Sequence, residues 1–116
     1  MRQVILNGRS GADGELKYTQ NGTAVVNLSV AVNEKRGDAW ETHWFKVTLF
    51  SKMAEVLAPR IKKGTELFIV GQLTSRRWQD KNGQNKESVE VLGNRVRICQ
   101  GKDDQEYSNE EGGPAL

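Results

Sequence analysis

Apolar and polar residues alternate along much of this chain, and this period of two limits the possible folds more than any other feature of the sequence. Within one such stretch, Val26 and Leu28 share one face of an extended chain while Asn27 faces the other way, because successive side chains of a strand point to opposite sides. Five segments show this alternation or a short apolar run, and we expect each to form a strand: 4–6, 24–33, 44–50, 67–73 and 88–98.

The connections between these segments carry turn and helix signals. Asn21-Gly22 is expected to join the first two strands and Asn82-Gly83 the last two, because Asn-Gly readily adopts the positive φ angles of tight hairpins. Between the third and fourth strands, apolar residues recur at the spacing of a helix. They are Met53, Val56, Leu57 and Ile61.

We expect this helix to be short, with Ser51 as its N-cap. Pro59 lacks a backbone donor and disfavours helical geometry at Ala58, so the helix should kink or end there. Three strands, one helix and two strands then follow in the order of the OB-fold, a Greek-key barrel of five strands. The sequence therefore predicts an all-β OB-fold over residues 1–99, with one short helix between strands 3 and 4.

The charge of the chain changes along its length. Residues 1–99 hold 16 Lys and Arg against 10 Asp and Glu, a net charge of +6, whereas residues 100–116 hold one Lys and five acids. The second segment has no apolar periodicity and contains Gly112-Gly113-Pro114, so we expect it to be a flexible acidic tail. A basic body favours an anionic partner but does not identify it.

Composition limits the remaining function classes. The 116 residues suffice for one domain, and no apolar run has the length of a membrane helix or a secretion signal, so the expected location is the cytoplasm. Cys99 and His43 are the single residues of their types. They are too few for an internal disulfide or for a zinc site of Cys and His ligands.

Motifs of common enzymes are absent from the sequence. It contains no G-x-x-x-x-G-K-[ST] loop, no G-x-G-x-x-G and no G-x-S-x-G. Packing or an interface explains His43, beside Trp44, better than base catalysis does. We therefore expect no enzymatic activity, catalytic residue, cofactor or metal site. The competing class, an OB-fold nuclease or deacetylase-like enzyme, would need clustered acids or metal ligands.

Two large aromatic side chains are expected on the outer face of the third strand. If the alternate residues Phe45, Val47 and Leu49 point into the barrel, Trp44 and Phe50 point outward with Lys46 between them. Bases of single-stranded nucleic acids stack on such rings for about 1–3 kcal/mol each, while Lys and Arg hold the phosphates. The alternative is a register shifted by one residue, in which the two rings form core or oligomer contacts.

A second aromatic and basic cluster lies at Arg76-Arg77-Trp78, ahead of the Asn82-Gly83 hairpin with Lys81 and Lys86. An indole beside guanidinium groups again combines stacking with charge. The loop between strands 4 and 5 contacts ligands in OB-folds. Trp78 could instead brace its hairpin while the arginines are solvated, but two such clusters on one expected side favour binding.

Five motifs, in order and at matching distances, resemble those of the bacterial single-stranded DNA-binding protein (SSB) family. They are Val4-Ile5-Leu6-x-Gly8-Arg9, Leu16-Lys17-Tyr18-x-x-Asn21-Gly22, Trp44-x-x-Val47-x-Leu49-Phe50-x-Lys52-x-Ala54-Glu55, Lys62-Lys63-Gly64 and Gly71-Gln72-Leu73-x-x-Arg76-x-Trp78. The resemblance implies an OB-fold that assembles, usually as a homotetramer and otherwise as a dimer. It also implies sequence-independent binding and protection of single-stranded DNA in replication, recombination and repair, in the bacterial cytoplasm at the nucleoid.

The resemblance also implies roles for single residues. The base-stacking aromatics of the family match Trp44, Phe50 and Trp78, and its phosphate-contacting residues match Lys52, Lys62, Lys63, Arg76 and Arg77. We add further residues to the expected nucleic-acid site: Lys46, Trp40, Arg9, Arg36 and Lys86. Phe45 falls where the family has an assembly-interface residue, which conflicts with its expected place in the core.

Two departures from the family pattern change what we expect. A stacking tryptophan that some members carry after the second strand falls near Arg36, and Trp40 could replace it from the other side of the loop. The acidic tip that ends in Ile-Pro-Phe in many members is replaced here, which puts the recruitment of replication and repair proteins in doubt. The tip residues expected to bind partners are Glu110, Glu111, Pro114, Ala115 and Leu116. The alternative function is an OB-fold accessory protein, of primosome type or borne by a plasmid or phage, that acts mainly through protein partners.

Overall fold

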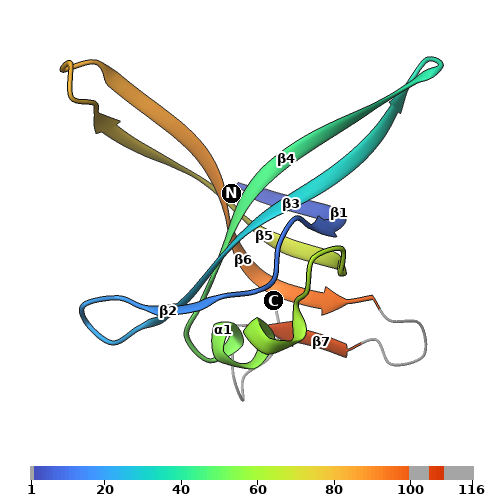
Figure 1. Cartoon of the computed structure of the whole chain (residues 1–116), viewed down its shortest axis with the longest axis horizontal. Helices are drawn as coiled ribbons and strands as arrows, with labels where there is room; N and C mark the ends of the chain where they lie inside the picture. The colour runs from blue at the N-terminus through green and yellow to red at the C-terminus, as the bar shows by residue number, and fades with distance from the viewer. Residues whose placement is uncertain (1, 100–104, 109–116) are drawn as a thin grey trace.

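The computed structural model describes residues 2–99 and 105–108, which form one sheet curved into a barrel (Figure 1). In chain order its strands are β1 Gln3–Ser10, β2 Leu16–Tyr18, β3 Ala24–Arg36, β4 Ala39–Phe50, β5 Glu66–Gln79, β6 Asn85–Ile98 and β7 Gln105–Ser108. Helix α1 (Ser51–Leu57) and the 3-10 helix η1 (Ala58–Arg60) stand between β4 and β5. Since β2 is a short additional strand, the helix follows the third long strand, as expected.

Strand β1 closes the barrel by pairing on both of its sides. It is antiparallel to β5 from Gln3 to Arg9, and it meets β3 at Arg9 and Ser10. Around the rest of the barrel, β3 pairs with β4, β4 lies parallel to β6, and β6 returns to β5. This closed order of five long strands confirms the predicted OB-fold.

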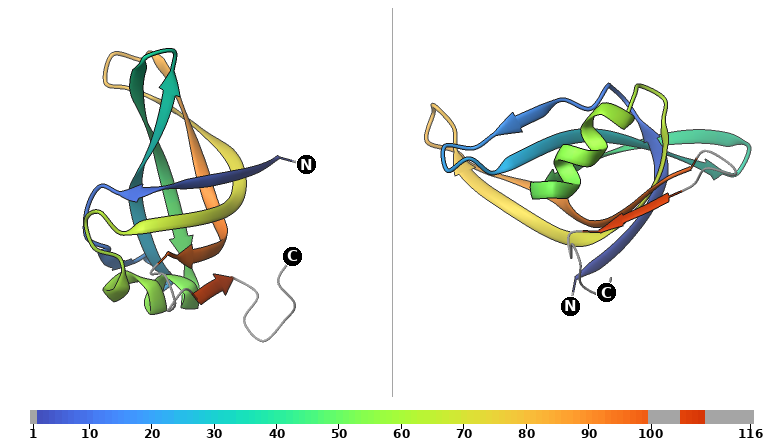
Figure 2. Two further views of the ribbon diagram at one scale, coloured as in Figure 1. Left: turned by 90° about the vertical axis from the view of Figure 1, so that its right-hand side faces the viewer. Right: turned by 90° about the horizontal axis from the view of Figure 1, so that it is seen from below.

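Aliphatic side chains from alternate strand positions fill the barrel. The large residues that are fully buried there include Val26, Val30, Val47, Leu49, Leu67, Ile69, Val91 and Val96. Helix α1 lies across one end of the barrel (Figure 2) and buries Met53, Ala54 and Leu57 against it. Burial of each such aliphatic side chain stabilises the fold by about 1.5–3 kcal/mol. The apolar residues that alternate along the sequence are therefore the ones that face the barrel interior.

The long strands run past the barrel as two hairpins that point away from each other (Figure 1). Strands β3 and β4 continue to a turn at Gly37 and Asp38, and β5 and β6 to a loop at 80–84. Residues 33–40 are exposed along the first hairpin, and residues 75–79 along the second. The strands therefore extend beyond the ranges expected from the sequence, because a hairpin with water on both faces needs no apolar alternation.

Two local expectations are wrong. The Asn21-Gly22 turn joins β2 to β3, because Leu16–Tyr18 forms a strand that pairs with β3. Ser51 is not the N-cap of α1: Phe50 takes that position, and Ser51 is the first helical residue, with a φ of 59°. By contrast, α1 ends before Pro59, as predicted, and Asn82-Gly83 lies in the loop between β5 and β6.

The segment 100–116, expected to be a flexible tail, contains β7, which pairs with β6. Its Tyr107 packs against the core, and the Tyr107 hydroxyl accepts a hydrogen bond of 2.6 Å from Nη1 of Arg60. The expectation is therefore wrong for residues 105–108, where pairing with β6 provides the order that apolar periodicity does not signal. The predicted partner-binding tip, Glu110, Glu111, Pro114, Ala115 and Leu116, lies outside the described residues.

Candidate nucleic-acid interface

The outer face of β4 presents the expected aromatic residues to the outside of the barrel. Val47 and Leu49 are buried and Phe45 is half-buried against the core, so Trp44 and Phe50 point the other way. Trp44 is 61% exposed, an unusual position for so large an apolar surface. The predicted register of this strand is thus confirmed, and Phe45 packs against the barrel interior.

The outer faces of β3 and β4 form the floor of an open groove of about 780 Å³. On this floor Trp44 lies opposite Ala31, Lys46 opposite Ser29, Thr48 opposite Asn27 and Phe50 opposite Val25. The hydroxyl of Thr48 donates a hydrogen bond of 3.1 Å to Oδ1 of Asn27. The remaining lining comes from neighbouring segments and includes Gly11, Ala12, Thr19, Arg76 and Glu90.

Gly11 allows the connection after β1 to lie against the indole of Trp44. A Cβ atom at position 11 would stand 2.7 Å from Cζ3 of Trp44, closer than any side chain permits. The backbone of Gly11 also donates a hydrogen bond of 2.8 Å to the carbonyl of Ser29 on the groove floor. The indole is therefore held at one side although most of its surface faces water.

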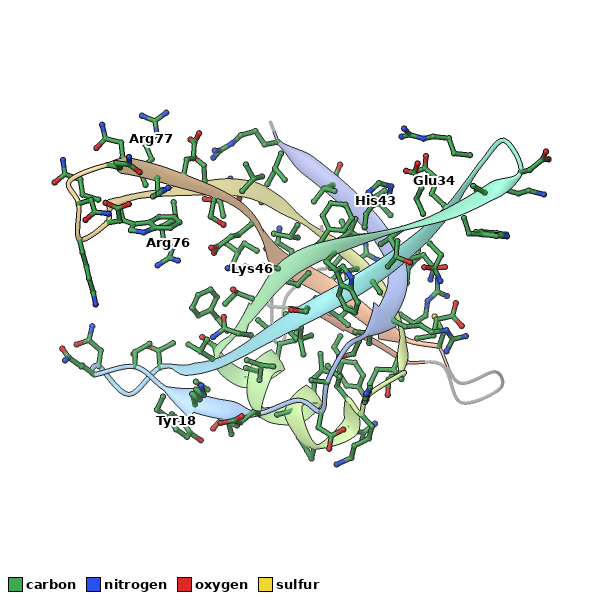
Figure 3. All side chains as sticks on the ribbon, turned by 45° about the horizontal axis from the view of Figure 1, so that its top comes forward. Tyr18, Glu34, His43, Lys46, Arg76 and Arg77 are labelled. Carbon is green, nitrogen blue, oxygen red and sulfur yellow. The ribbon has the colours of Figure 1, made fainter. Side chains whose placement is uncertain are left out.

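The β5–β6 hairpin supplies the second aromatic and basic cluster. The guanidinium carbon of Arg76 lies 4.9 Å from the centroid of the Trp78 ring, and Nε of Arg76 lies 3.5 Å from Oε2 of Glu90. Figure 3 shows Arg76 and Arg77 on opposite sides of the hairpin. Because only Arg76 lines the groove, the three consecutive residues that we predicted as one cluster are divided between two faces.

A comparison with protein-family profiles matches residues 1–99 to the single-strand binding protein family. The chain belongs to this family. Membership implies single-stranded DNA binding, and the family is a DNA-binding, non-enzymatic one for which roles in replication and repair are typical. The match covers every strand of the barrel, so the resemblance drawn from the five motifs is confirmed.

In this single-strand binding protein, Trp40 continues the aromatic row of β4. It stands four residues before Trp44 and therefore on the same strand face, opposite Lys35 on β3. Its side chain is 69% exposed. The structure thus places a third ring on the outer face of this strand, near the tip of the β3–β4 hairpin and beyond the groove lining.

Three of the four predicted arginines are paired with acidic side chains and do not line the groove. The pairs are Arg9–Glu66, Arg36–Glu41 and Arg77–Glu87, with N···O distances of 3.8, 3.6 and 3.1 Å. Arg36 lies on the strand face opposite Trp40, where it also meets Glu34. Exposed pairs of this kind are worth at most about 1 kcal/mol, so a phosphate could displace the carboxylates.

The predicted lysines lie around the groove rather than inside it, with the exception of Lys46. Lys52 is exposed in the first turn of α1, and Lys62 and Lys63 are exposed after η1. The backbone N–H of Lys63 donates a hydrogen bond of 2.9 Å to Oδ1 of Asp13, which joins this loop to the connection that lines the groove. Lys86 lies opposite Trp78 on the β5–β6 hairpin.

The groove also contains residues that the sequence analysis does not assign to the site. Asn27 and Ser29 carry a usable signal, because the alternation in β3 already places them on the outer face. Gly11 and Glu90 carry no such signal, since they reach the groove from the connection after β1 and from β6. Only the three-dimensional arrangement reveals their proximity to Trp44 and Arg76.

Two further findings concern the described residues, 2–99 and 105–108. No helix among them has the length and apolar character needed to cross a membrane. Within the same residues, no group of three His, Cys, Asp or Glu side chains could hold a metal ion. His43 is half-buried on the face opposite Trp44, with its Nε2 atom 3.6 Å from Oε2 of Glu41.

Proposed function

We propose that the protein coats single-stranded DNA without sequence preference and protects it during replication, recombination and repair, in the cytoplasm at the nucleoid. The groove on β3 and β4 supports this proposal, because the rings of Trp44 and Phe50 flank the ammonium of Lys46 along one strand and Arg76 stands at the wall. Every base has a face that can stack on a ring, and phosphate contacts carry no sequence information. Such a site holds a strand whatever its sequence.

The proposed path of the strand follows the outer face of β4 from Phe50 past Trp44 to Trp40. The ten steps from Trp40 to Phe50 along the strand span about 33 Å at about 3.3 Å per residue. Trp78, on the β5–β6 hairpin, stacks on a further base. The phosphates are held by Lys46, Lys52, Lys62, Lys63 and Arg76, with Arg9, Arg36, Arg77 and Lys86 as outlying contacts.

Tryptophan fluorescence tests this proposal directly, since all three indoles lie on the proposed path. We expect a long oligo-dT to quench the emission strongly and a duplex of equal length to quench it little. Each phosphate contact should contribute about −0.7 to the slope of log K against log salt, so five contacts predict a slope of about −3 to −4. Equal quenching by duplex, or binding that does not depend on salt, would contradict the proposal.

We further propose that the chain acts as a homo-oligomer, with a tetramer expected and a dimer as the alternative. Ile5 on the outer face of β1 is 59% exposed, and its sheet neighbours Val70 and Phe68 are only half-buried. On β6, Arg95 and Arg97 lie opposite Val70 and Phe68 and border this apolar patch. An exposed apolar patch with a polar border is suited to a second copy of the chain. Sedimentation equilibrium should give the mass of four chains, and a mass of 13.0 kDa would refute assembly.

A further inference from the structure

Glu90 is the one acidic residue among those described that line the groove. It lies on β6 opposite Thr74 of β5, and only 20% of its side chain is exposed. A carboxylate repels phosphate, and this repulsion is stronger where the charges are partly removed from water. Lys46 and Arg76 in the same groove attract an anionic strand, whereas the carboxylate of Glu90 opposes its binding.

The carboxylate of Glu90 holds the cation that a phosphate would use. Its Oε2 atom lies 3.5 Å from Nε of Arg76, whose guanidinium carbon is 4.9 Å from the centroid of the Trp78 ring. Arg76 thus covers part of one face of the indole while its charge is offset by Glu90. A DNA strand that stacks a base on this face of Trp78 and places a phosphate on Arg76 must displace Arg76 from the indole and from Glu90.

We propose that Glu90 competes with DNA for Arg76, so that binding exchanges the carboxylate for a phosphate. In the free protein, Glu90 keeps the guanidinium over Trp78. In the complex, the phosphate takes the guanidinium, and Glu90 recaptures it when the strand leaves. Glu90 therefore lowers the affinity for single-stranded DNA and favours release of the strand. Such release is needed by a protein that covers DNA only transiently. This inference rests on the proposed function and adds a residue that limits the strength of binding.

The same hairpin offers a matched control in the pair Arg77–Glu87. This pair has an N···O distance of 3.1 Å and joins the same residue types across the same two strands. It lies on the opposite side of the hairpin, and neither of its residues lines the groove. Removing the charge of Glu87 changes the net charge of the protein as much as removing that of Glu90 does. A difference between the two variants therefore reports on the groove.

The test compares Glu90→Gln and Glu87→Gln by the anisotropy of a labelled oligo-dT over a range of salt concentrations. We expect E90Q to bind about threefold or more tightly at low salt, the size of one exposed ion pair. Its slope of log K against log salt should be steeper by about 0.7. In the wild-type protein the carboxylate that Arg76 leaves takes up a cation again, which offsets one of the counterions released from the strand, and E90Q has no such carboxylate. E87Q should tighten binding less than E90Q does, because its partner Arg77 lies outside the groove and is only an outlying contact. Glu90→Ala should change affinity in the same direction as E90Q.

A double variant tests whether the effect acts through Arg76. Arg76→Gln should weaken binding, and adding E90Q to it should raise the affinity by a smaller factor than E90Q does in the wild-type protein. Only the direct repulsion between Glu90 and phosphate is then relieved, because no guanidinium is left to release. Weaker or unchanged binding by E90Q, or equal tightening by E87Q, would overturn the role of Glu90 while single-stranded DNA binding stands. Failure of the folded wild-type protein to bind oligo-dT would overturn the proposed function as well. Circular dichroism confirms that each variant is folded.

Discussion

Replacing both Trp44 and Trp78 with alanine should weaken oligo-dT binding by about 2–6 kcal/mol, because each stacked base contributes about 1–3 kcal/mol. Both indoles project outside the barrel, with exposures of 61% and 42%. Their removal therefore creates no cavity in the core, and the unfolding temperature should change little. Because the variant loses two of the three fluorescent side chains, binding is best measured by the anisotropy of a labelled oligo-dT.

Three control variants show what this loss of affinity means. Trp44→Phe and Trp78→Phe keep a ring at each position and should retain most of the affinity that alanine removes. Trp40→Ala should cost less than Trp44→Ala, because Trp40 lies near the hairpin tip and does not line the groove. A folded double alanine variant with wild-type affinity would show that the strand does not use the groove on β3 and β4.

Leu49→Ala should lower the free energy of unfolding by about 2–5 kcal/mol, the usual cost of removing a buried leucine side chain. Leu49 has no exposed surface, and it lies on β4 between Thr48 and Phe50, which both line the groove. Chemical denaturation followed by circular dichroism measures the loss. A change below about 1 kcal/mol would mean that the barrel collapses into the space that leucine leaves.

Gly93 provides an internal check on this packing. A Cβ atom at position 93 would stand 2.6 Å from Cδ2 of Leu49, whereas the next nearest atoms are 3.6 Å away. Gly93→Ala should therefore destabilise the wild-type protein but cost less, or even stabilise it, in the Leu49→Ala background. We expect a coupling free energy of about 1 kcal/mol or more in this double-mutant cycle. Additive effects would contradict the close approach of β6 to Leu49.

The sequence was most informative where one face of a strand is buried. The alternation around Val47 and Leu49 is sufficient to predict that Trp44 and Phe50 project from the barrel, because a shift of one residue would expose the whole apolar set. The position of the helix followed in the same way from the spacing of Met53, Val56, Leu57 and Ile61. The outward residues of β4 were therefore predictable from burial, and the OB-fold from burial together with the order of strands, turns and helix.

Sequence reasoning failed where neither face of an element is buried or where the partner is distant. The outer halves of the two hairpins carry no apolar alternation, so their lengths were underestimated. Arg76, Arg77 and Trp78 are adjacent in the sequence and were therefore predicted as one cluster. Consecutive residues of a strand point to opposite sides, so Arg77 lies on the other side of the hairpin. Glu90 enters the groove from β6 and Gly11 from the connection after β1. Both are distant from Trp44 in the chain, and a single sequence carries no signal of such long-range neighbours.

The two hairpins that extend from the barrel are expected to be more flexible than the barrel itself. We expect amide protons in the barrel to exchange with solvent only when the core opens. Those near Gly37 and Gly83, where each hairpin has one cross-strand ladder, should exchange through local fraying. Trp40 and Trp78 are carried by these compliant segments, while Trp44 and Phe50 are fixed to the rigid wall. A bound strand would therefore contact one rigid surface, the barrel face of β3 and β4, and two hairpins that can move to fit it.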